Sequence, residues 1–223
     1  GFNNFNLDLM YGLPGQTIQE GLDDLSAVLQ YAPPHLSWYQ LTLEPNTAFY
    51  KRPPLLPCED KIVDLQFKGG DILTSRKLMP YEISAWSQPD FECYHNNNYW
   101  SFGDYIGIGA GAYSKVTHLV QKKIIRYGRH NSPRAYLVNP TDSNEYAAID
   151  QKQLPFEFML NSLRHYRPIE RSLFESRTGL AWEGLIPFFE KAQSKELVEW
   201  NEHQLKVTPL GRQFYNDLVA IFL

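Results

Sequence analysis

Hydrophobic and polar residues alternate near the start of the chain and then change to a helical spacing. Every second residue from Phe5 to Tyr11 is apolar or aromatic, and this period of two predicts a β-strand. The sequence Gly-Leu-Pro-Gly at residues 12–15 interrupts the strand. Thr17 and Glu20 then have the spacing of a capping box, which predicts the start of a helix.

The same alternation of elements continues to residue 86. The pattern predicts a second strand over residues 36–43, a helix from Glu59 to about Leu73 and a third strand over residues 81–86. Gly69 and Gly70 weaken that helix by roughly 1 kcal/mol each relative to alanine. Strands that alternate with helices indicate a parallel α/β layer with right-handed crossovers. Because three strands do not complete such a sheet, we expect earlier strands to precede this chain.

The second half of the chain has a different pattern. Residues 103–114 are rich in glycine and alanine, and residues 126–154 show little periodicity. Helical spacing returns at Pro155, and Thr208-Pro209 fits the cap and first position of a last helix after a short strand. We therefore expect three parts: an α/β part with a Gly-rich extension (1–125), a linker or loop (126–154) and a small helical, winged-helix-like domain (155–223).

Composition narrows the classes of function. The formal charge is −4 and no basic run occurs, which argues against a nucleic-acid binder, including a DNA-binding role for residues 155–223. No apolar run approaches the roughly 20 residues of a membrane span, and no signal peptide is visible. With only two cysteines, a reducing cytoplasmic location is expected. The chain starts at Gly1 without a methionine, so we expect a truncated sequence rather than a processed natural terminus.

Polar residues share one phase of the predicted strands. Asn6 and Asp8 alternate with the leucines of the first strand, and Gln40 and Thr42 share a phase on the second, with Glu44 just beyond it. In a closed or partly closed parallel barrel, polar residues near the carboxyl ends of strands line the site. We therefore expect Asp8 to face the lumen within reach of Thr42. The alternatives are a satisfied polar network without a ligand, or an Asp8 that only caps the loop at Gly12.

A second candidate site is His95, which precedes three asparagines, Tyr99 and Trp100. Imidazole can ligate a metal or a haem iron, and aromatic rings can stack on a macrocycle. The alternative is a hydrogen-bonded loop histidine.

Cys58 and Cys93 lack the spacing of cluster ligands. The small residues nearby either allow close approach of a ligand or close packing of a strand; they are Gly103, Gly107, Gly109 and Gly111.

Three segments in this order together resemble the oxygen-independent coproporphyrinogen III oxidase family. They are residues 6–17 (Asn-Leu-Asp-Leu-Met-Tyr-Gly-Leu-Pro-Gly-Gln-Thr), residues 39–47 (Tyr-Gln-Leu-Thr-Leu-Glu-Pro-Asn-Thr) and the run from His95 through residues 103–112. The resemblance covers nearly the whole chain. It implies the C-terminal part of a partial (β/α)6 radical-SAM barrel, followed by a helical domain. It also implies a [4Fe–4S] cluster on a C-x-x-x-C-x-x-C motif, which this chain lacks, so we expect no catalysis from the chain alone.

The resemblance also implies roles for individual residues. Asp8 and Thr42 fall where the family contacts S-adenosylmethionine, and Tyr113 lies in the segment near that cofactor. The sequence H-N-x-x-Y-W is similar to the mark of the haem-chaperone branch, in which the histidine contacts haem; this implies haem binding by His95 and delivery to haem-accepting proteins. The alternative is the oxidase, which decarboxylates porphyrinogen propionates. The dipeptide Tyr113-Ser114 stands where many relatives have His-Gly. The sequence is also compatible with a homodimer.

Overall fold

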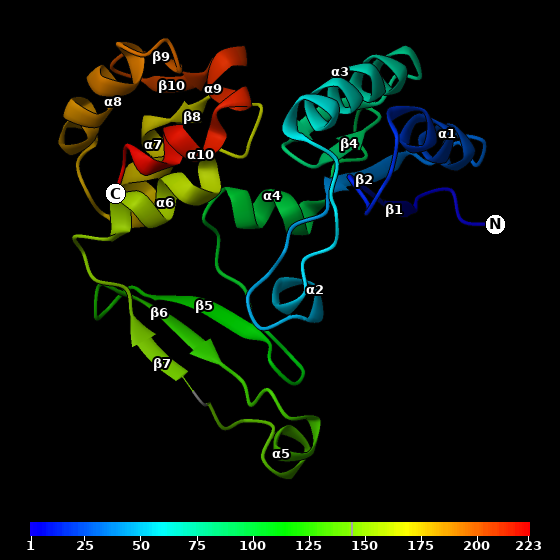
Figure 1. Cartoon of the computed structure of the whole chain (residues 1–223). Coiled ribbons are helices and arrows are strands. Elements are labelled where there is room, and N and C mark those ends of the chain that lie inside the picture. The colour runs from blue at the N-terminus through cyan, green and yellow to red at the C-terminus, as the bar shows by residue number, and fades with distance from the viewer. Residues whose placement is uncertain (144) are drawn as a thin grey trace. The chain divides into compact units, whose positions relative to one another are not determined.

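The computed structural model describes residues 1–143 and 145–223. Contacts within the chain divide it into two compact units, Gly1–Cys93 and Tyr94–Leu223 (Figure 1). The division therefore falls at residue 93 and differs from the expected boundary at residue 125. The physical reason is that Phe102 and Ile124 are buried in the core of the C-terminal helices.

The first unit is built on a four-stranded sheet with the strand order β1-β2-β4-β3. Figure 1 shows α1 and α3 on one side of this sheet. The strands are β1 (Asn6–Tyr11), β2 (His35–Gln40), β3 (Met79–Glu82) and β4 (Ala85–Ser87). The helices are α1 (Ile18–Leu29), the short α2 (Ala48–Lys51) and α3 (Glu59–Ser75). Strands β1 and β2 pair in parallel, as the α/β pattern predicts.

The first helix begins at the capping box that the sequence predicts. The backbone N–H of Glu20 donates to Thr17 Oγ1 at 3.2 Å, and the backbone N–H of Thr17 donates to Glu20 Oε2 at 2.8 Å. Two donors that the helix itself cannot satisfy are thereby paired. The prediction of this helix start is confirmed.

The predicted third strand is instead a hairpin of β3 and β4, and β4 runs antiparallel to β2. The turn at residues 83–84 is stabilised by the buried carboxylate of Glu82, which accepts from Ser84 N at 3.1 Å and from Ser84 Oγ at 2.9 Å. A local side-chain acceptor reverses the chain here without a glycine. The expectation of a single parallel strand over residues 81–86 is therefore wrong.

The core of the first unit lies between the sheet and its helices. Leu25 of α1, Leu36 of β2 and Leu73 of α3 are completely buried. Gly69 of α3 lies directly over Trp38 of β2, and a Cβ atom at this position would overlap the indole ring. The glycine that weakens the helix locally is thus required for the packing of the helix on the sheet.

Gly69→Ala is expected to destabilise the protein although alanine is the better helix former. The new methyl group has to displace Trp38 in a closely packed core, a type of overpacking that costs about 1–3 kcal/mol. Urea unfolding of Gly69→Ala and of the control Gly184→Ala, where no atom lies within 4 Å of the added Cβ, checks this. Equal unfolding free energies for the two variants would contradict the packing described for Gly69.

The second unit begins with α4 (Tyr94–Trp100) and an antiparallel sheet of the order β5-β6-β7. Its strands are β5 (Tyr113–His118), β6 (Lys123–Gly128) and β7 (Glu145–Ala148). The region expected to be a linker, residues 126–154, thus contains the end of β6, α5 (Pro133–Val138) and β7. Arg126 also forms a two-fold ion pair with Glu157, at 2.8 and 2.6 Å. The described residues of this region therefore form regular structure and are attached to the helical part.

The C-terminal part combines short helices with a three-stranded antiparallel sheet of the order β8-β10-β9. The helices are α6 (Leu154–Ser162), α7 (Arg171–Thr178), the 3₁₀ helix η1 (Trp182–Leu185), α8 (Ile186–Gln193), α9 (Pro209–Gln213) and α10 (Tyr215–Ala220). The strands are β8 (Ile169–Glu170), β9 (Val198–Trp200) and β10 (Gln204–Val207). A helical domain with a small sheet is confirmed, whereas its winged-helix character stays a prediction.

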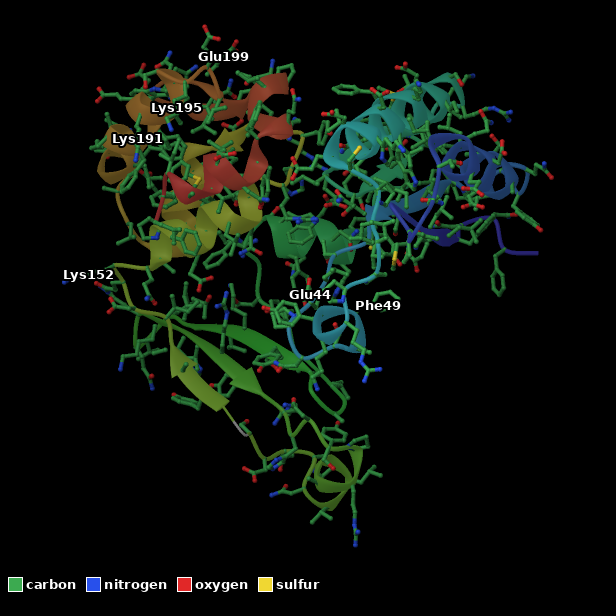
Figure 2. The ribbon with its side chains drawn as sticks, in the orientation of Figure 1. Glu44, Phe49, Lys152, Lys191, Lys195 and Glu199 are labelled. Atoms are coloured by element: carbon green, nitrogen blue, oxygen red, sulfur yellow. The ribbon has the colours of Figure 1, made fainter. Side chains whose placement is uncertain are left out.

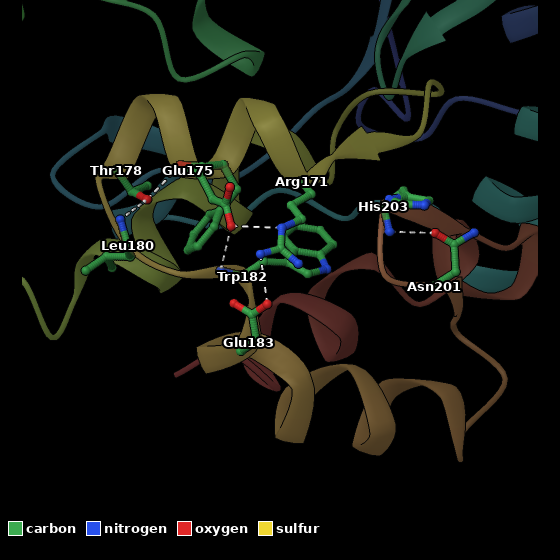
Figure 3. Close-up of polar contacts among 9 residues, drawn as sticks. Arg171, Glu175, Thr178, Leu180, Trp182, Glu183, Asn201 and His203 are labelled. Atoms are coloured by element: carbon green, nitrogen blue, oxygen red, sulfur yellow. Dashed lines mark hydrogen bonds and ion pairs between the residues drawn. The ribbon is translucent and has the colours of Figure 1, made fainter.

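Polar contacts fix the ends of these short helices. Arg171 bridges Glu175 at 2.9 Å and Glu183 at 2.8 Å, and Glu175 also accepts the backbone N–H of Trp182 at 3.4 Å (Figure 3). Thr208 caps α9 as predicted, because its Oγ1 accepts from Gly211 N at 2.9 Å. The expected single last helix is broken at residue 214, which has non-helical dihedral angles.

Charged side chains between residues 191 and 199 lie at the surface of the C-terminal helical part. Lys191, Lys195 and Glu199 are exposed, and Figure 2 labels their positions. These residues therefore form an ordinary solvated face. Among the described helices, none is both long enough and apolar enough to cross a membrane.

Candidate functional site

The strand β1 presents Asp8 on the face opposite to the helices. Leu7 and Leu9 pack against the core of the first unit, whereas Asp8 is exposed. The loop after the strand does not use Asp8 as its cap, because the backbone N–H groups of residues 12 and 13 donate to Gln16 Oε1 at 2.8 and 3.2 Å. The alternative of Asp8 as a loop cap is therefore excluded, and the predicted phase of β1 is confirmed.

Thr42 does not lie beside Asp8 on the sheet. In the register of the parallel pair, Asp8 faces Ser37. Thr42 follows five positions after Ser37, which corresponds to about 16 Å along an extended chain. Strand β2 ends at Gln40, and Thr42 Oγ1 donates to Glu44 Oε1 at 3.0 Å. The expected proximity of Asp8 and Thr42 is not found, because the register of β1 and β2 places Asp8 opposite Ser37.

Gln40 also differs from its predicted position. It pairs with Tyr11 and has the same phase as Leu36 and Trp38, which face the helices. The polar face of β2 is formed instead by His35, Ser37 and Tyr39. The sequence of β2 has polar and aromatic residues in both phases, so the alternation alone did not identify the face that packs on the helices.

The residues next to Asp8 form a hydrogen-bonded network. Asn6 Nδ2 donates to Asp8 Oδ1 at 2.9 Å. Asn6 Oδ1 is 2.7 Å from His35 Nδ1, and it accepts from Ser37 N at 3.1 Å and from Ser37 Oγ at 3.2 Å. His35 Nε2 is 2.8 Å from the hydroxyl of Tyr81. The network joins the exposed Asp8 to two buried side chains that the sequence did not indicate.

The environment of His35 favours its neutral form. Burial lowers the pKa of His35 below its ordinary value, and the carboxylates of Asp8 and Glu92 oppose this shift. A neutral imidazole has one donor and one acceptor nitrogen. His35 can therefore donate to Asn6 and accept from Tyr81 at the same time.

His95 lies in the first turn of α4, and its side chain is exposed. Its ring contacts the ring of Tyr99, with centroids 4.6 Å apart. Tyr99 in turn stacks on Tyr105 at 4.2 Å. Within the described part of the chain, the imidazole of His95 makes no hydrogen bond and no ion pair. The alternative of a hydrogen-bonded loop histidine is therefore wrong.

The Gly-rich segment is packed against its neighbours at two positions. Asn98 Nδ2 donates to the carbonyl of Asp104 at 2.8 Å, and a Cβ atom at Gly103 would overlap Asn98. Gly107 N donates to Ser114 Oγ at 2.9 Å, and a Cβ atom at Gly107 would overlap the backbone of β5. Of the two readings of these glycines, close packing accounts for Gly103 and Gly107.

An ion pair also anchors this segment. Lys115 is buried, and its Nζ donates to Asp104 Oδ1 and to the carbonyl of Phe102, both at 3.0 Å. Burial lowers the pKa of Lys115, and Asp104 opposes this shift. For Asp104, burial acts to raise the pKa, but hydrogen bonds from Thr117 and Lys115 outweigh it and lower the pKa. Asp104 is thus held in its charged form at the base of the Gly-rich segment.

Asp104→Ala is expected to cost more stability than Lys115→Met. The first change leaves a buried ammonium without its carboxylate, whereas the second removes the charge and keeps an apolar side chain. Loss of one partner of a fully buried pair costs about 3–5 kcal/mol, and since the Asp104 side chain is 41% exposed we expect about 2 kcal/mol. Unfolding free energies from urea titrations check the order, and a larger loss for Lys115→Met would contradict it.

Tyr113 and the two cysteines complete the residues that the sequence singles out. Tyr113 is the first residue of β5, is 44% exposed and, like His95, belongs to the second unit. Among the described residues, no group of three or more His, Cys, Asp or Glu side chains could hold a metal ion. Cys58 and Cys93 are free thiols. A [4Fe–4S] cluster takes four thiolates, so the donors in this chain do not fit one.

A cavity of about 520 Å³ lies in the second unit. Ser101, His165, Ile169 and Leu173 are among the residues that line it, and none of the residues that the sequence singled out does. The cavity therefore adds nothing to the sites at Asp8 and His95.

Comparison with known proteins shows which proteins this chain resembles. Residues 149–214 match the model of the HemN C-terminal domain. The resemblance of the sequence to the coproporphyrinogen oxidase family is thereby confirmed.

The whole chain is similar to curated haem chaperones. It is 40% identical over 225 residues to the haem chaperone HemW of Haemophilus influenzae and 40% identical over 223 residues to that of Escherichia coli K12. The haem chaperone HemW of Bacillus subtilis is 29% identical over 231 residues. All three matches cover 100% of this chain but only 58–60% of the relative.

A solved structure shows the same fold. The chain matches coproporphyrinogen III oxidase (HemN) of Escherichia coli, a radical SAM enzyme, with a TM-score of 0.74 and 18% identity. The match covers 100% of this chain and 55% of the enzyme. At this identity the likeness concerns the fold alone, and it agrees with the barrel segment and helical domain that the sequence predicts.

Proposed function

We propose that this chain is the haem-binding part of a haem chaperone, which delivers haem to acceptor proteins. The observation that carries the proposal is the exposed His95 imidazole, which makes no hydrogen bond in the described part of the chain. The 40% identity to proteins named as haem chaperones supports the same function. A cytoplasmic location is part of this proposal, and the two free cysteines support it.

The chemistry of His95 fits a haem iron. A neutral imidazole nitrogen is a common axial ligand of haem, and a nitrogen without a hydrogen-bond partner is ready to coordinate. Contact with the ring of Tyr99 restricts the rotation of the imidazole. The ring of Tyr99 is itself held in place by stacking on the ring of Tyr105. Because His95 is exposed, a bound haem would keep one face accessible to an acceptor. Such a site suits transfer better than permanent storage.

The proposal includes S-adenosylmethionine. The exposed carboxylate of Asp8 fits the sulfonium, ammonium or ribose hydroxyl groups of this molecule, and Thr42 and Tyr113 are the further expected contacts. A [4Fe–4S] cluster would be held by a segment outside this chain, because the donors within it do not fit. In radical-SAM chemistry the cluster supplies an electron to bound S-adenosylmethionine. The residues of this chain would bind and orient that molecule.

The experiment uses the protein together with its cluster-binding segment and compares two activities. Under anaerobic conditions we expect haem to pass from the loaded protein to an apo-haem protein. The change of the Soret band monitors this transfer. We expect no useful rate of protoporphyrinogen formation from coproporphyrinogen in the presence of reductant and S-adenosylmethionine. Formation of protoporphyrinogen without haem transfer would contradict the proposed chaperone function and favour the oxidase activity.

A further inference from the structure

The side-chain amide of Asn6 can have only one orientation. Its Oδ1 atom lies within 3.2 Å of three groups, the Nδ1 of His35 and the backbone N–H and hydroxyl of Ser37. An inverted amide would direct its NH₂ group toward the N–H of Ser37, which is only a donor. The amide Nδ2 of Asn6 must therefore point to Asp8.

The orientation of Asn6 also defines the tautomer of His35. Since Asn6 Oδ1 can only accept, His35 Nδ1 carries the hydrogen. His35 Nε2 is then the acceptor for the hydroxyl of Tyr81, at 2.8 Å. His35 and Tyr81 are only 5% and 4% exposed, so the packing of the sheet holds both rings in place. The network has a rigid end at Tyr81 and an exposed end at Asp8.

The network leaves half of the Asp8 carboxylate free. Within the described part of the chain, Oδ1 accepts from Asn6 and Oδ2 has no hydrogen-bond partner. A carboxylate on an exposed strand would otherwise rotate among its rotamers, at an entropic cost when a ligand binds. The bond from Asn6 reduces this cost, because it holds the carboxylate in one rotamer with Oδ2 available to a ligand.

We infer that Asn6 and His35 are positioning residues that orient Asp8 for S-adenosylmethionine. The inference rests on the proposed binding of that molecule by Asp8. Neither positioning residue needs to touch the ligand. Asn6 acts through the carboxylate of Asp8, and His35 acts through the amide of Asn6. The identities of both residues matter. The network requires a side-chain amide at position 6 and a nitrogen donor, such as His35 Nδ1, at position 35.

The test measures the affinity for S-adenosylmethionine by isothermal titration calorimetry, on the protein with its cluster-binding segment. Removal of a hydrogen bond to a charged group weakens binding by about tenfold or more, which we expect for Asn6→Ala. His35→Leu is expected to have a similar effect. His35→Asn is expected to keep the affinity within about threefold, since its amide N–H can replace the Nδ1 donor. The matched control Asn4→Ala changes an exposed asparagine and is expected to bind normally.

A second readout separates positioning from a loss of structure. The haem titration of each variant is expected to equal that of the wild type, because the haem site is at His95. Equal losses of affinity in His35→Asn and His35→Leu, or a wild-type affinity in Asn6→Ala while Asp8→Ala is weakened, would overturn the inference and leave Asp8 as a binding residue. A wild-type affinity in Asp8→Ala would overturn the inference together with the proposed role of Asp8, without affecting haem binding by His95.

Discussion

His95→Ala is expected to weaken haem binding at least tenfold and to shift the Soret band. The substitution removes the exposed imidazole that we propose as the iron ligand, so that haem is held only by contacts with its ring. A coordinate bond to iron contributes more than the 1.4 kcal/mol that a tenfold change represents. Haem titration of the 223-residue chain, followed by absorbance, measures both the affinity and the band position.

His203→Ala is the matched control for this titration. His203 is also exposed and lies in the same unit, but its Nε2 lies 3.4 Å from Glu202 Oε1, and no aromatic ring among the described residues packs against it. We expect the control to bind haem like the wild type. Equal affinity and equal spectra for His95→Ala and the wild type would exclude His95 as the haem ligand.

Phe158→Ala is expected to lower the free energy of unfolding by about 3–5 kcal/mol, the range for removal of a buried aromatic ring. Phe158 lies on α6, is completely buried and contacts the rings of Phe102 and Phe174, with centroids 5.7 and 5.1 Å away. Alanine leaves a cavity at the point where the N-terminal part of the second unit meets its helices. Urea unfolding followed by circular dichroism and tryptophan fluorescence measures the loss.

The same helix provides the control for this measurement. Leu160 is 38% exposed, and its contact with the hydroxyl of Tyr215 uses the backbone carbonyl, which a substitution retains. Leu160→Ala is therefore expected to cost less than about 1 kcal/mol. Similar losses for Phe158→Ala and Leu160→Ala would mean that α6 is not packed as described.

The sequence pattern correctly predicted the helix starts that depend only on residues close together in the chain. The capping box at Thr17 and Glu20 and the N-cap Thr208 act within four residues, and both were found where the sequence placed them. The hairpin of β3 and β4 was missed because its turn has neither glycine nor asparagine and depends on the carboxylate of Glu82. The sheet strands in the expected linker were missed because they are short and alternate weakly.

The candidate site was predicted only in part, because some of its contacts depend on tertiary packing rather than on local sequence. The period of two on β1 correctly separated Asp8 from the leucines that pack on the helices. The register between β1 and β2 depends on tertiary packing, so the sequence could not show that Asp8 faces Ser37 rather than Thr42. His35 and Tyr81 are far apart in the sequence, and no motif joins them. His95, which we propose as the haem ligand, was singled out by its motif, whereas its exposure and its contact with Tyr99 came from the structure.

The most direct test of the central claim is the coordination of the iron itself. Electron paramagnetic resonance of the ferric haem complex, with ¹⁵N-labelled histidine in the 223-residue chain, reports whether a histidine nitrogen binds the iron. We expect a histidine nitrogen signal in the wild type and in His203→Ala, and its loss in His95→Ala. A histidine signal that persists unchanged in His95→Ala, or a wild-type complex without one, would contradict haem binding by His95.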